Sequence, residues 1–267
     1  MSETRFIDIV HRGRVIGIEH VWLNDAATQS PVLVFLHEGL GSVAMWRDFP
    51  ARLCAAIGCR GLVYSRPGYG RSTPKPPGER WQPDYLAIQA VELLPAFLDA
   101  VGLDAGQRRL YLFGHSDGGT IALIHAAQVG AALAGIVVMA PHIKVEPISI
   151  AGIEQACAAY DSGDLRTRLA RFHDDVDSAF RGWSEAWLDP RFRTWSIEAD
   201  LPAIRCPVLA IQGEQDEYGT MAQIDGIAAR VSTCTRVKLA GCGHQPHREQ
   251  PQAVIDAVCH WLPAPPR

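Results

Sequence analysis

The sequence predicts an α/β fold in which helices cover both faces of a mostly parallel β-sheet. Short, continuously apolar runs recur along the chain, which is typical of strands buried on both faces of a parallel sheet. Segments with helical spacing separate these runs, and this alternation is characteristic of parallel sheets. One stretch, residues 142–203, contains no such apolar run and interrupts the alternation. The chain is therefore expected to be an α/β domain with a helical insertion.

The first half of the chain supplies an edge hairpin, two buried strands and a helix. Two β-rich runs on either side of the turn HRGR predict a hairpin over residues 5–23, which suits the antiparallel edge of a mixed sheet. Buried strands are predicted over residues 31–37 and 60–65, with a helix over residues 45–58 between them. Residues 66–78 are rich in Pro and Gly and predict a loop.

A long helix and four more strands follow the loop. The helix is predicted over residues 84–102, with Asp84 as a candidate N-cap and a kink at Pro95. The remaining elements are strands at 109–114, 135–141, 206–213 and 235–241, a helix that starts near Asp117, and a closing helix at 252–262.

Residues 142–203 are predicted to form helices, and this stretch is too long for an ordinary crossover between two strands. We therefore expect a helical cap over 142–203, inserted into one core domain that comprises residues 1–141 and 204–267. Since the apolar runs are short, no transmembrane helix is expected. The segment MSETRFIDIV does not have the pattern of a secretory signal.

The composition excludes several functional classes. The chain has 267 residues and a formal net charge of −4, so no global positive field would attract nucleic acid or an anionic membrane. Seven cysteines occur without a C-x-x-C pair, which indicates neither a zinc site nor a disulfide framework. We expect a cytoplasmic protein with reduced thiols and no metal, a monomer or homodimer whose partner is a small-molecule substrate.

The hexapeptide GHSDGG, residues 114–119, lies between a predicted strand and a predicted helix. It matches G-x-S-x-G, with Ser116 between Gly114 and Gly118. A nucleophile in such a sharp turn has strained backbone, and glycine two residues on either side lets the chain pass closely. The helix that follows directs its N–H groups toward developing negative charge. The alternative is a helix-capping serine in a tight turn.

A nucleophilic serine needs a base, and His244 is the preferred candidate. It directly follows the strand over 235–241, in a loop at the carboxyl end of the sheet, where sites in such folds gather. His247 is the alternative. His115 adjoins the serine but is expected to point away from it.

The base needs an acid that fixes its tautomer, and Asp216 follows the strand over 206–213 at a suitable distance. Glu214 is the alternative. The oxyanion hole is expected to use the backbone N–H of Asp117 and one N–H from the glycine-rich loop HEGLGS, residues 37–42. Gly39 is the preferred donor in that loop, and Leu40 is the alternative.

With the chain order Ser116, Asp216, His244, the protein resembles the α/β-hydrolase superfamily over essentially its whole length. The resemblance implies an eight-stranded, mostly parallel sheet, a helical cap before the acid-bearing strand, and no cofactor. The segment YSRPGYGRS, residues 64–72, also resembles the D-x-R-G-x-G-x-S segment of that superfamily. Glu38 departs from the pattern, because the superfamily usually has glycine after the histidine at that place.

The resemblance implies a serine hydrolase that cleaves a small carboxylic ester or a related lactone or thioester through an acyl-enzyme. A C–C bond hydrolase of ring-cleavage products would share the same fold and triad. A ligand sensor with an idle triad is the alternative that is not an enzyme. The two carboxylates near the oxyanion hole, Glu38 and Asp117, count against an anionic substrate.

Asp117 and the tryptophans of the cap are candidate substrate-binding residues, together with Glu38. The elbow SDGG resembles that of the valacyclovir-hydrolase type of amino-acid ester hydrolases, which implies an ammonium-binding role for Asp117. The structural alternative is that Asp117 caps its helix or pairs with Arg66. Trp183 and Trp187 share a helix face and are expected to wall an acyl pocket. Trp195 is also expected to wall this pocket. His142 and His173 are not expected to be catalytic.

Overall fold

The core of the protein is an eight-stranded sheet with the strand order β1-β2-β4-β3-β5-β6-β7-β8. The computed structural model describes residues 3–27, 29–103, 109–130 and 133–262, so both ends of the predicted core domain lie outside the described residues. The strands are β1 (Thr4–His11), β2 (Arg14–Leu23), β3 (Val32–Leu36), β4 (Arg60–Tyr64), β5 (Leu110–His115), β6 (Leu133–Met139), β7 (Val208–Gly213) and β8 (Cys234–Leu239).

The sheet is mixed at one edge and parallel elsewhere. Strand β1 pairs with β2, and β2 with β4, in antiparallel register, whereas the pairs from β4 through β3, β5, β6 and β7 to β8 are parallel. The hairpin turns at Arg12 and Gly13, which have φ angles of 50° and 76°. Positive φ at both central residues matches the right-handed twist of the two strands. The predicted edge hairpin and the buried strands are thus confirmed.

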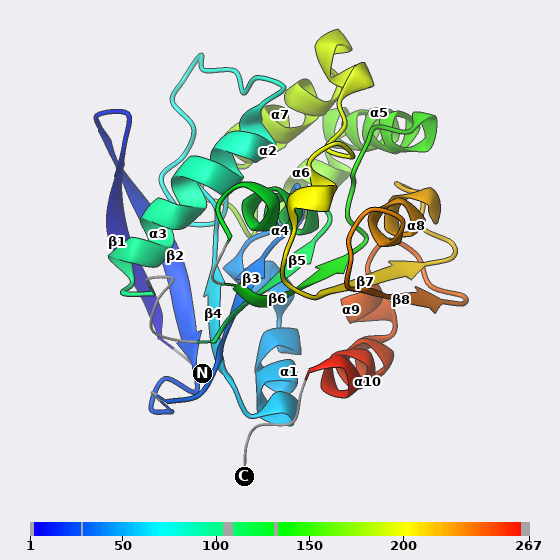
Figure 1. Cartoon of the computed structure of the whole chain (residues 1–267). Coiled ribbons are helices and arrows are strands. Elements are labelled where there is room, and N and C mark those ends of the chain that lie inside the picture. Colours follow the sequence, from blue (N-terminus) through cyan, green and yellow to red (C-terminus); the bar gives the residue numbers. More distant parts are fainter. Residues whose placement is uncertain (1–2, 28, 104–108, 131–132, 263–267) are drawn as a thin grey trace.

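Helices cover both faces of the sheet (Figure 1). Two of them, α1 (Phe49–Ile57) and α10 (Pro251–Trp261), pack on one face against side chains such as Phe35 and Phe113. The opposite face carries α4 (Asp117–Gln128) and α8 (Ala222–Ala228). Residues of β3 alternate between the two apolar clusters, because successive side chains of a strand point to opposite faces. This explains why the strands are continuously apolar in sequence.

The helix predicted over residues 45–58 begins later than expected. A 3-10 turn, η1 (Val43–Trp46), comes first, and α1 follows after a break. Arg47 has a φ of 54°, which an α-helix does not permit, so the helical spacing of the sequence runs across a real interruption. The apolar residues on both sides of Arg47 still face the same core cluster, which is why the spacing looked continuous.

The helix predicted over residues 84–102 is continuous in space but irregular. It consists of α2 (Tyr85–Ile88), a π-helical segment η2 (Gln89–Leu93) and α3 (Leu94–Ala100). Pro95 has no N–H to donate, and the chain passes this position by changing its hydrogen-bond spacing just before it. Asp84 occupies the N-cap position, but its side chain makes no capping hydrogen bond.

The chain between β6 and β7 is helical, as the sequence predicts. It contains α5 (Pro147–Asp161), α6 (Asp164–Leu169), α7 (Val176–Trp187) and two 3-10 turns, η3 (Pro190–Thr194) and η4 (Leu201–Ala203). These helices lie together beyond the ends of β5 and β6 (Figure 1). Two short helices flank the last strand: α8 before β8, and α9 (Pro246–Glu249) between β8 and α10. We call residues 142–203 the insertion.

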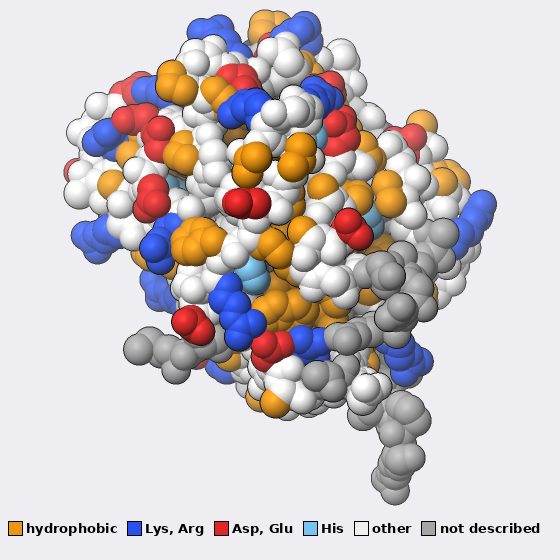
Figure 2. All heavy atoms as spheres, turned by 90° about the vertical axis from the view of Figure 1, so that its left-hand side faces the viewer, with side chains coloured by type: hydrophobic (Ala, Val, Ile, Leu, Met, Phe, Trp, Pro, Cys, Tyr) orange, Lys and Arg blue, Asp and Glu red, His pale blue; other side chains and the backbone are white. Residues whose placement is uncertain are grey.

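The surface carries both signs of charge. Figure 2 shows the face on the side of the β1–β2 hairpin, where acidic and basic side chains are interspersed with scattered apolar ones. Phe6, Val10 and Val15 of the hairpin are among the large apolar side chains that are exposed. Among the described residues, no helix combines the length and the apolar character needed to cross a membrane.

Candidate active site

Ser116 occupies the sharp turn between β5 and α4. Its φ is 53° and its ψ is −118°, a strained conformation for a residue with a side chain. A Cβ atom at Gly114 would lie 2.2 Å from the carbonyl oxygen of Gly118, and one at Gly118 would lie 2.0 Å from that of Leu36. The backbone therefore approaches itself so closely on both sides of Ser116 that only glycine fits, as the sequence pattern predicts.

The structure brings Ser116, His244 and Asp216 together at the carboxyl ends of three parallel strands. The Oγ of Ser116 lies 3.0 Å from Nε2 of His244. The Nδ1 of His244 lies 2.8 Å from Oδ1 of Asp216. Because the carboxylate oxygen can only accept, Nδ1 carries a proton and Nε2 is free to accept the proton of the serine. All three residues are buried.

The surroundings of Asp216 favour its charged form. Its Oδ1 accepts the backbone N–H groups of Tyr218 and Gly219, at 2.8 and 3.2 Å. Burial acts to raise the pKa of Asp216, but the hydrogen bond from His244 and these N–H donors bring it below its usual value. Burial likewise acts to lower the pKa of His244, and the bond to Asp216 with nearby carboxylates overcomes this, so that the pKa is raised.

The two alternatives considered from sequence lie away from Ser116. The His247 ring packs against Trp46 and His115, with ring centroids 5.0 and 4.9 Å apart. Glu214 is exposed. A residue that sequence reasoning missed, Glu217, accepts the backbone N–H of His244 at 3.1 Å and so helps to hold the loop.

The buried ring of His115 faces the partly exposed carboxylate of Glu38 behind the loop that carries His244. The Nε2 of His115 donates to the carbonyl oxygen of His244 at 2.7 Å. Its Nδ1 lies 3.6 Å from Oε2 of Glu38. Burial acts to raise the pKa of Glu38, but His115 and the other nearby histidines hold it well below its usual value. Glu38 lines the cavity described below, and its carboxylate is turned toward His115.

The peptide that joins Glu38 to Gly39, just after β3, is held in place by hydrogen bonds to its carbonyl oxygen. The carbonyl oxygen of Glu38 accepts three hydrogen bonds: from Nδ1 of His37 at 2.7 Å, from the guanidinium of Arg66 at 2.8 Å and from the N–H of Gly41 at 3.1 Å. In a trans peptide the C=O and N–H groups point in opposite directions. The N–H of Gly39 therefore points away from these three donors, and Gly39 lines the same cavity as Ser116. Leu40 lines that cavity as well.

The carboxylate of Asp117 is fully buried and already bonded. Oδ2 accepts the hydroxyl of Tyr85 at 2.7 Å, and Oδ1 accepts Nε1 of Trp187 at 3.2 Å. The guanidinium of Arg66 lies 3.7 Å from Oδ2. Burial raises the pKa of Asp117, although Arg66 and the two hydrogen bonds oppose the shift. These contacts correspond to the structural alternative considered from sequence, in which Asp117 pairs with Arg66.

A cavity of about 450 Å³ opens beside Ser116 and His244. Trp183 and Trp187 of α7 line it, as expected, and the indole of Trp183 lies so close to Gly39 that a Cβ atom there would be 2.2 Å from Nε1. Trp195 does not line this cavity, because its ring stacks on Phe192 with the centroids 5.0 Å apart. The insertion therefore supplies one wall of the site.

Two histidines near the site differ in what they contact. His142 lines the cavity, and burial lowers its pKa to about 3, so it is a neutral ring beside His244. His173 is held outside: its Nδ1 accepts the N–H of Gly70 and its Nε2 donates to the carbonyl of Leu40, both at 2.9 Å. It ties the insertion to the loop after β3. His142 directly follows the strand predicted over residues 135–141, and this position is the feature of the sequence that could have placed it at the site.

Three arginines that sequence reasoning missed also line the cavity: Arg47 before α1, Arg168 in α6 and Arg248 in α9. A guanidinium nitrogen of Arg248 donates to the carbonyl of Met45 at 2.8 Å. None of the three lies within ion-pair distance of a carboxylate in the part of the chain that the structure describes. Arg47 has the positive φ noted above, and strained backbone is common at functional sites.

Comparison with known proteins agrees with this architecture. A family model described as "Alpha/beta hydrolase family" matches residues 33–257. Among curated proteins, 2-succinyl-6-hydroxy-2,4-cyclohexadiene-1-carboxylate synthase of Salmonella enteritidis is 26% identical over 264 residues, which cover 87% of this chain and 94% of that protein.

Solved structures of the same fold cover nearly the whole chain. A hydrolase from Pseudomonas aeruginosa PA01 superposes with a TM-score of 0.74 at 21% identity, covering 97% of each chain. A thermophilic esterase from Thermogutta terrifontis superposes with a TM-score of 0.73 at 18% identity, covering 97% of this chain and 98% of that one. At these identities the likeness concerns the fold alone.

Proposed function

The chain belongs to the alpha/beta hydrolase family, and from that premise we propose that it is a serine hydrolase that cleaves a small carboxylic ester or a related acyl compound. The observation that carries the proposal is the alignment of Ser116, His244 and Asp216, with 3.0 Å from Oγ to Nε2 and 2.8 Å from Nδ1 to Oδ1. This geometry lets one histidine accept the serine proton while a carboxylate fixes its tautomer.

In the proposed mechanism, Nε2 of His244 takes the hydroxyl proton as Ser116 attacks the carbonyl carbon. The oxyanion forms between the backbone N–H groups of Gly39 and Asp117, which donate to it most strongly in the transition state. His244 then gives the proton to the leaving group, leaving Ser116 acylated. Water attacks the acyl-enzyme with the same histidine as base, and the carboxylic acid leaves.

The arginines of the cavity point to an acyl group that carries a negative charge. Arg47, Arg168 and Arg248 come from three separate segments and line one cavity, although the whole chain has a net charge of −4. A guanidinium without a carboxylate partner can bind a substrate carboxylate in a bidentate manner. We therefore favour an ester or thioester whose acyl chain ends in a carboxylate.

This preference reverses the sequence argument that Glu38 and Asp117 disfavour an anionic substrate. In the structure the charge of Glu38 faces His115, and that of Asp117 faces Arg66 and two hydrogen-bond donors. The oxygens of Asp117 already have partners, and the carboxylate of Glu38 is turned toward His115. An amino-acid ester is correspondingly less well supported than a carboxylate-bearing ester.

A second candidate is cleavage or formation of a C–C bond in a carboxylate-bearing compound by the same triad. The arginines favour such a substrate equally well, and the Salmonella relative is named as the synthase of a cyclohexadiene carboxylate. The triad geometry does not separate this chemistry from ester hydrolysis. A ligand sensor with an idle triad is a further alternative, which the reactivity of Ser116 tests.

The test combines active-site labelling with a matched ester panel. A fluorophosphonate should label the wild type and not Ser116→Ala; absence of labelling in the wild type would exclude an active nucleophile. The panel compares the p-nitrophenyl esters of butyrate, of mono-succinate and of alanine. We expect the succinate ester to give the highest kcat/KM, with Arg168→Gln selectively lowering that value. Labelling without hydrolysis of any ester would favour the C–C bond chemistry.

A further inference from the structure

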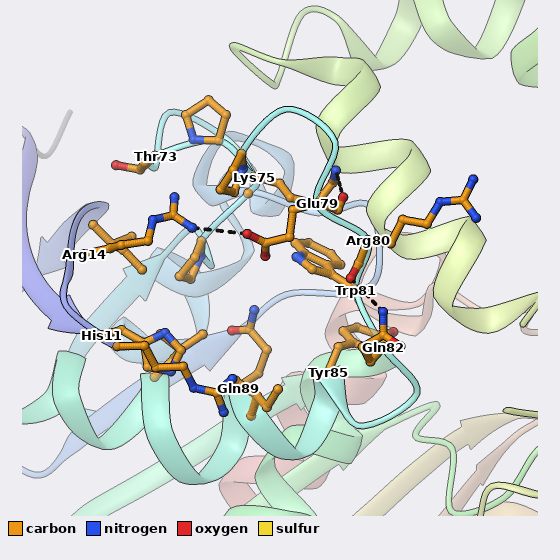
Figure 3. Close-up of a pocket in the computed structure, with 18 residues that line it drawn as sticks. His11, Arg14, Thr73, Lys75, Glu79, Arg80, Trp81, Gln82, Tyr85 and Gln89 are labelled. Atoms are coloured by element: carbon orange, nitrogen blue, oxygen red, sulfur yellow. Dashed lines mark hydrogen bonds and ion pairs between the residues drawn. The ribbon is translucent and has the colours of Figure 1, made fainter. Parts of the chain in front are cut away.

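A second cavity, of about 340 Å³, lies away from Ser116. It is enclosed by the turn of the β1–β2 hairpin, the loop over residues 67–82 and the helix formed by α2 and η2 (Figure 3). It shares no lining residue with the cavity at Ser116. Its volume lies in the range of pockets that hold small molecules. Neither the triad nor the proposed mechanism uses it.

The floor of this cavity carries the side-chain amide of a largely buried glutamine. Gln89 is only 5% exposed, and its side chain rises from the helix into the cavity (Figure 3). Its amide makes no hydrogen bond with any residue that the structure describes. Because this amide lines the cavity and has no partner among the described residues, it can form hydrogen bonds with a ligand there. Gln89 also begins the π-helical segment, an irregularity that is frequent at functional sites.

The rim of the cavity is cationic, and one of its cations is unmatched. Four Lys or Arg residues and one carboxylate, that of Glu79, contribute to the lining. The three arginines have carboxylate partners: Arg12 with Glu92 at 2.7 Å, Arg14 with Glu79 at 3.2 Å and Arg80 with Glu185 at 3.5 Å.

Lys75 is different, because its ammonium group donates to the backbone carbonyl of Glu79. Within the described ranges, no carboxylate lies at ion-pair distance from it. One unmatched positive charge suits a ligand with one negative charge, which a carboxylate carries and a phosphate usually exceeds. Lys75 and Gln89 lie on opposite sides of the cavity (Figure 3). The lining also includes the apolar side chains of Ile16, Trp81 and Leu93. The ion pair of Arg14 with Glu79 crosses the same cavity (Figure 3).

We propose that this cavity is a binding site for a small monocarboxylate with a flat apolar body and a hydrogen-bonding group at its far end. The carboxylate pairs with Lys75, the apolar body lies along Ile16, Trp81 and Leu93, and the far group bonds the amide of Gln89. This site is separate from the arginines at the triad, and the inference does not rest on the proposed hydrolase activity.

The test uses three probes that differ by one group each. 4-Hydroxybenzoate has both the carboxylate and the far hydroxyl, benzoate lacks the hydroxyl, and 4-hydroxybenzyl alcohol lacks the charge. Calorimetric titration of the wild type should give the tightest binding for 4-hydroxybenzoate. In Gln89→Met, which keeps the side-chain length, its affinity should fall about tenfold, to that of benzoate. In Lys75→Met, its affinity should fall to that of 4-hydroxybenzyl alcohol.

Control variants separate this cavity from the rest of the molecule. Gln252→Leu and Lys144→Met remove the same kinds of group from other surfaces and should leave binding unchanged. Arg168→Gln reports whether the probe binds at the triad cavity instead. Thermal melting checks that each variant is folded, and Gln89→Ala replaces Gln89→Met if the latter is not. Binding that persists in both the Gln89 and Lys75 variants, that is lost in Arg168→Gln, or that is absent from the wild type, would overturn the proposal.

Discussion

The imidazole of His115 donates a hydrogen bond to the backbone carbonyl of His244, with 2.7 Å between Nε2 and the oxygen. On its other side the ring faces the carboxylate of Glu38. The carbonyl of Glu38 also fixes the peptide that presents the N–H of Gly39. One residue pair therefore connects the loop after β3 with the loop that carries the proposed base. Glu38, which departs from the usual glycine, has a positioning role in this arrangement.

We predict that His115→Asn lowers kcat by about 10- to 100-fold while KM changes little, because the loop of His244 loses a fixed contact and misplacement of a catalytic group is costly. Glu38→Gln should have a smaller effect in the same direction. Steady-state kinetics with the preferred ester measures both values. His260→Asn, a substitution of an exposed histidine of α10, is the control. An unchanged kcat in His115→Asn would show that the contact does not position the base.

The pH dependence of hydrolysis should follow the protonation of His244. The base acts in its neutral form, and its pKa is raised, so kcat/KM should increase with pH up to a value above the ordinary histidine pKa of about 6.5. Asp216 and Glu217 both contribute to this rise. In Glu217→Gln the increase in kcat/KM should therefore occur at lower pH. The value of kcat/KM on the high-pH plateau should stay near that of the wild type.

The control for this pH prediction is Glu214→Gln, which removes an exposed carboxylate in the same loop. It should leave the pH profile unchanged. Asp216→Asn should lower the plateau by about 10³- to 10⁴-fold, because the tautomer of His244 is no longer fixed. A Glu217→Gln profile identical to that of the wild type would contradict the electrostatic argument.

The sequence predicted the sheet, and it indicated the residues of the candidate site, because both depend on local patterns. Runs such as the one in β3 are apolar throughout, since both faces of the sheet are covered. Ser116 stands out because close backbone approach requires Gly114 and Gly118. His244 and Asp216 directly follow strands, and the ends of parallel strands meet at one edge. Each of these signals is contained within a few consecutive residues of the chain.

The contacts around the site could not be predicted, because they join residues that are far apart in the chain. Trp187 bonds Asp117 across 70 positions, and His115 bonds His244 across 129. Arg168 reaches the cavity only through the packing of the insertion on the sheet. A single sequence contains the residue types of such contacts and says nothing of their pairing. The helix expected over residues 45–58 is present from Phe49 to Ile57, and its predicted start is wrong for a different reason, a local φ at Arg47 that no residue type required.

Gly118→Ala should disrupt the turn at Ser116. The new Cβ atom would lie 2.0 Å from the backbone oxygen of Leu36, and a strand in the centre of the sheet has no room to move. We expect a loss of at least about 2 kcal/mol in the free energy of unfolding, measured by urea denaturation. Gly119→Ala is the matched control, because a Cβ atom there would lie 3.1 Å from the Cβ of Pro141 and 3.2 Å from the carbonyl oxygen of Gly114, contacts that a shift of a few tenths of an ångström relieves. Equal losses in the two variants would contradict the steric argument.

Asp117→Asn separates the structural role of this carboxylate from a role in binding an ammonium group. Arg66 is fully buried, and two of its guanidinium nitrogens have no hydrogen-bond partner among the described residues. Removing the nearby negative charge leaves a buried cation without compensation, which typically costs about 3–5 kcal/mol. We therefore expect a large fall in the free energy of unfolding.

The same variant should lose activity toward butyrate and alanine esters by the same factor, because the oxygens of Asp117 face Tyr85, Trp187 and Arg66 rather than a substrate. The kcat/KM values of both esters, compared with those of the wild type, measure this. Asp189→Asn is the control for stability, since that carboxylate pairs with Arg191 on the surface. A loss confined to the alanine ester, with stability unchanged, would show instead that Asp117 binds the ammonium group of an amino-acid ester.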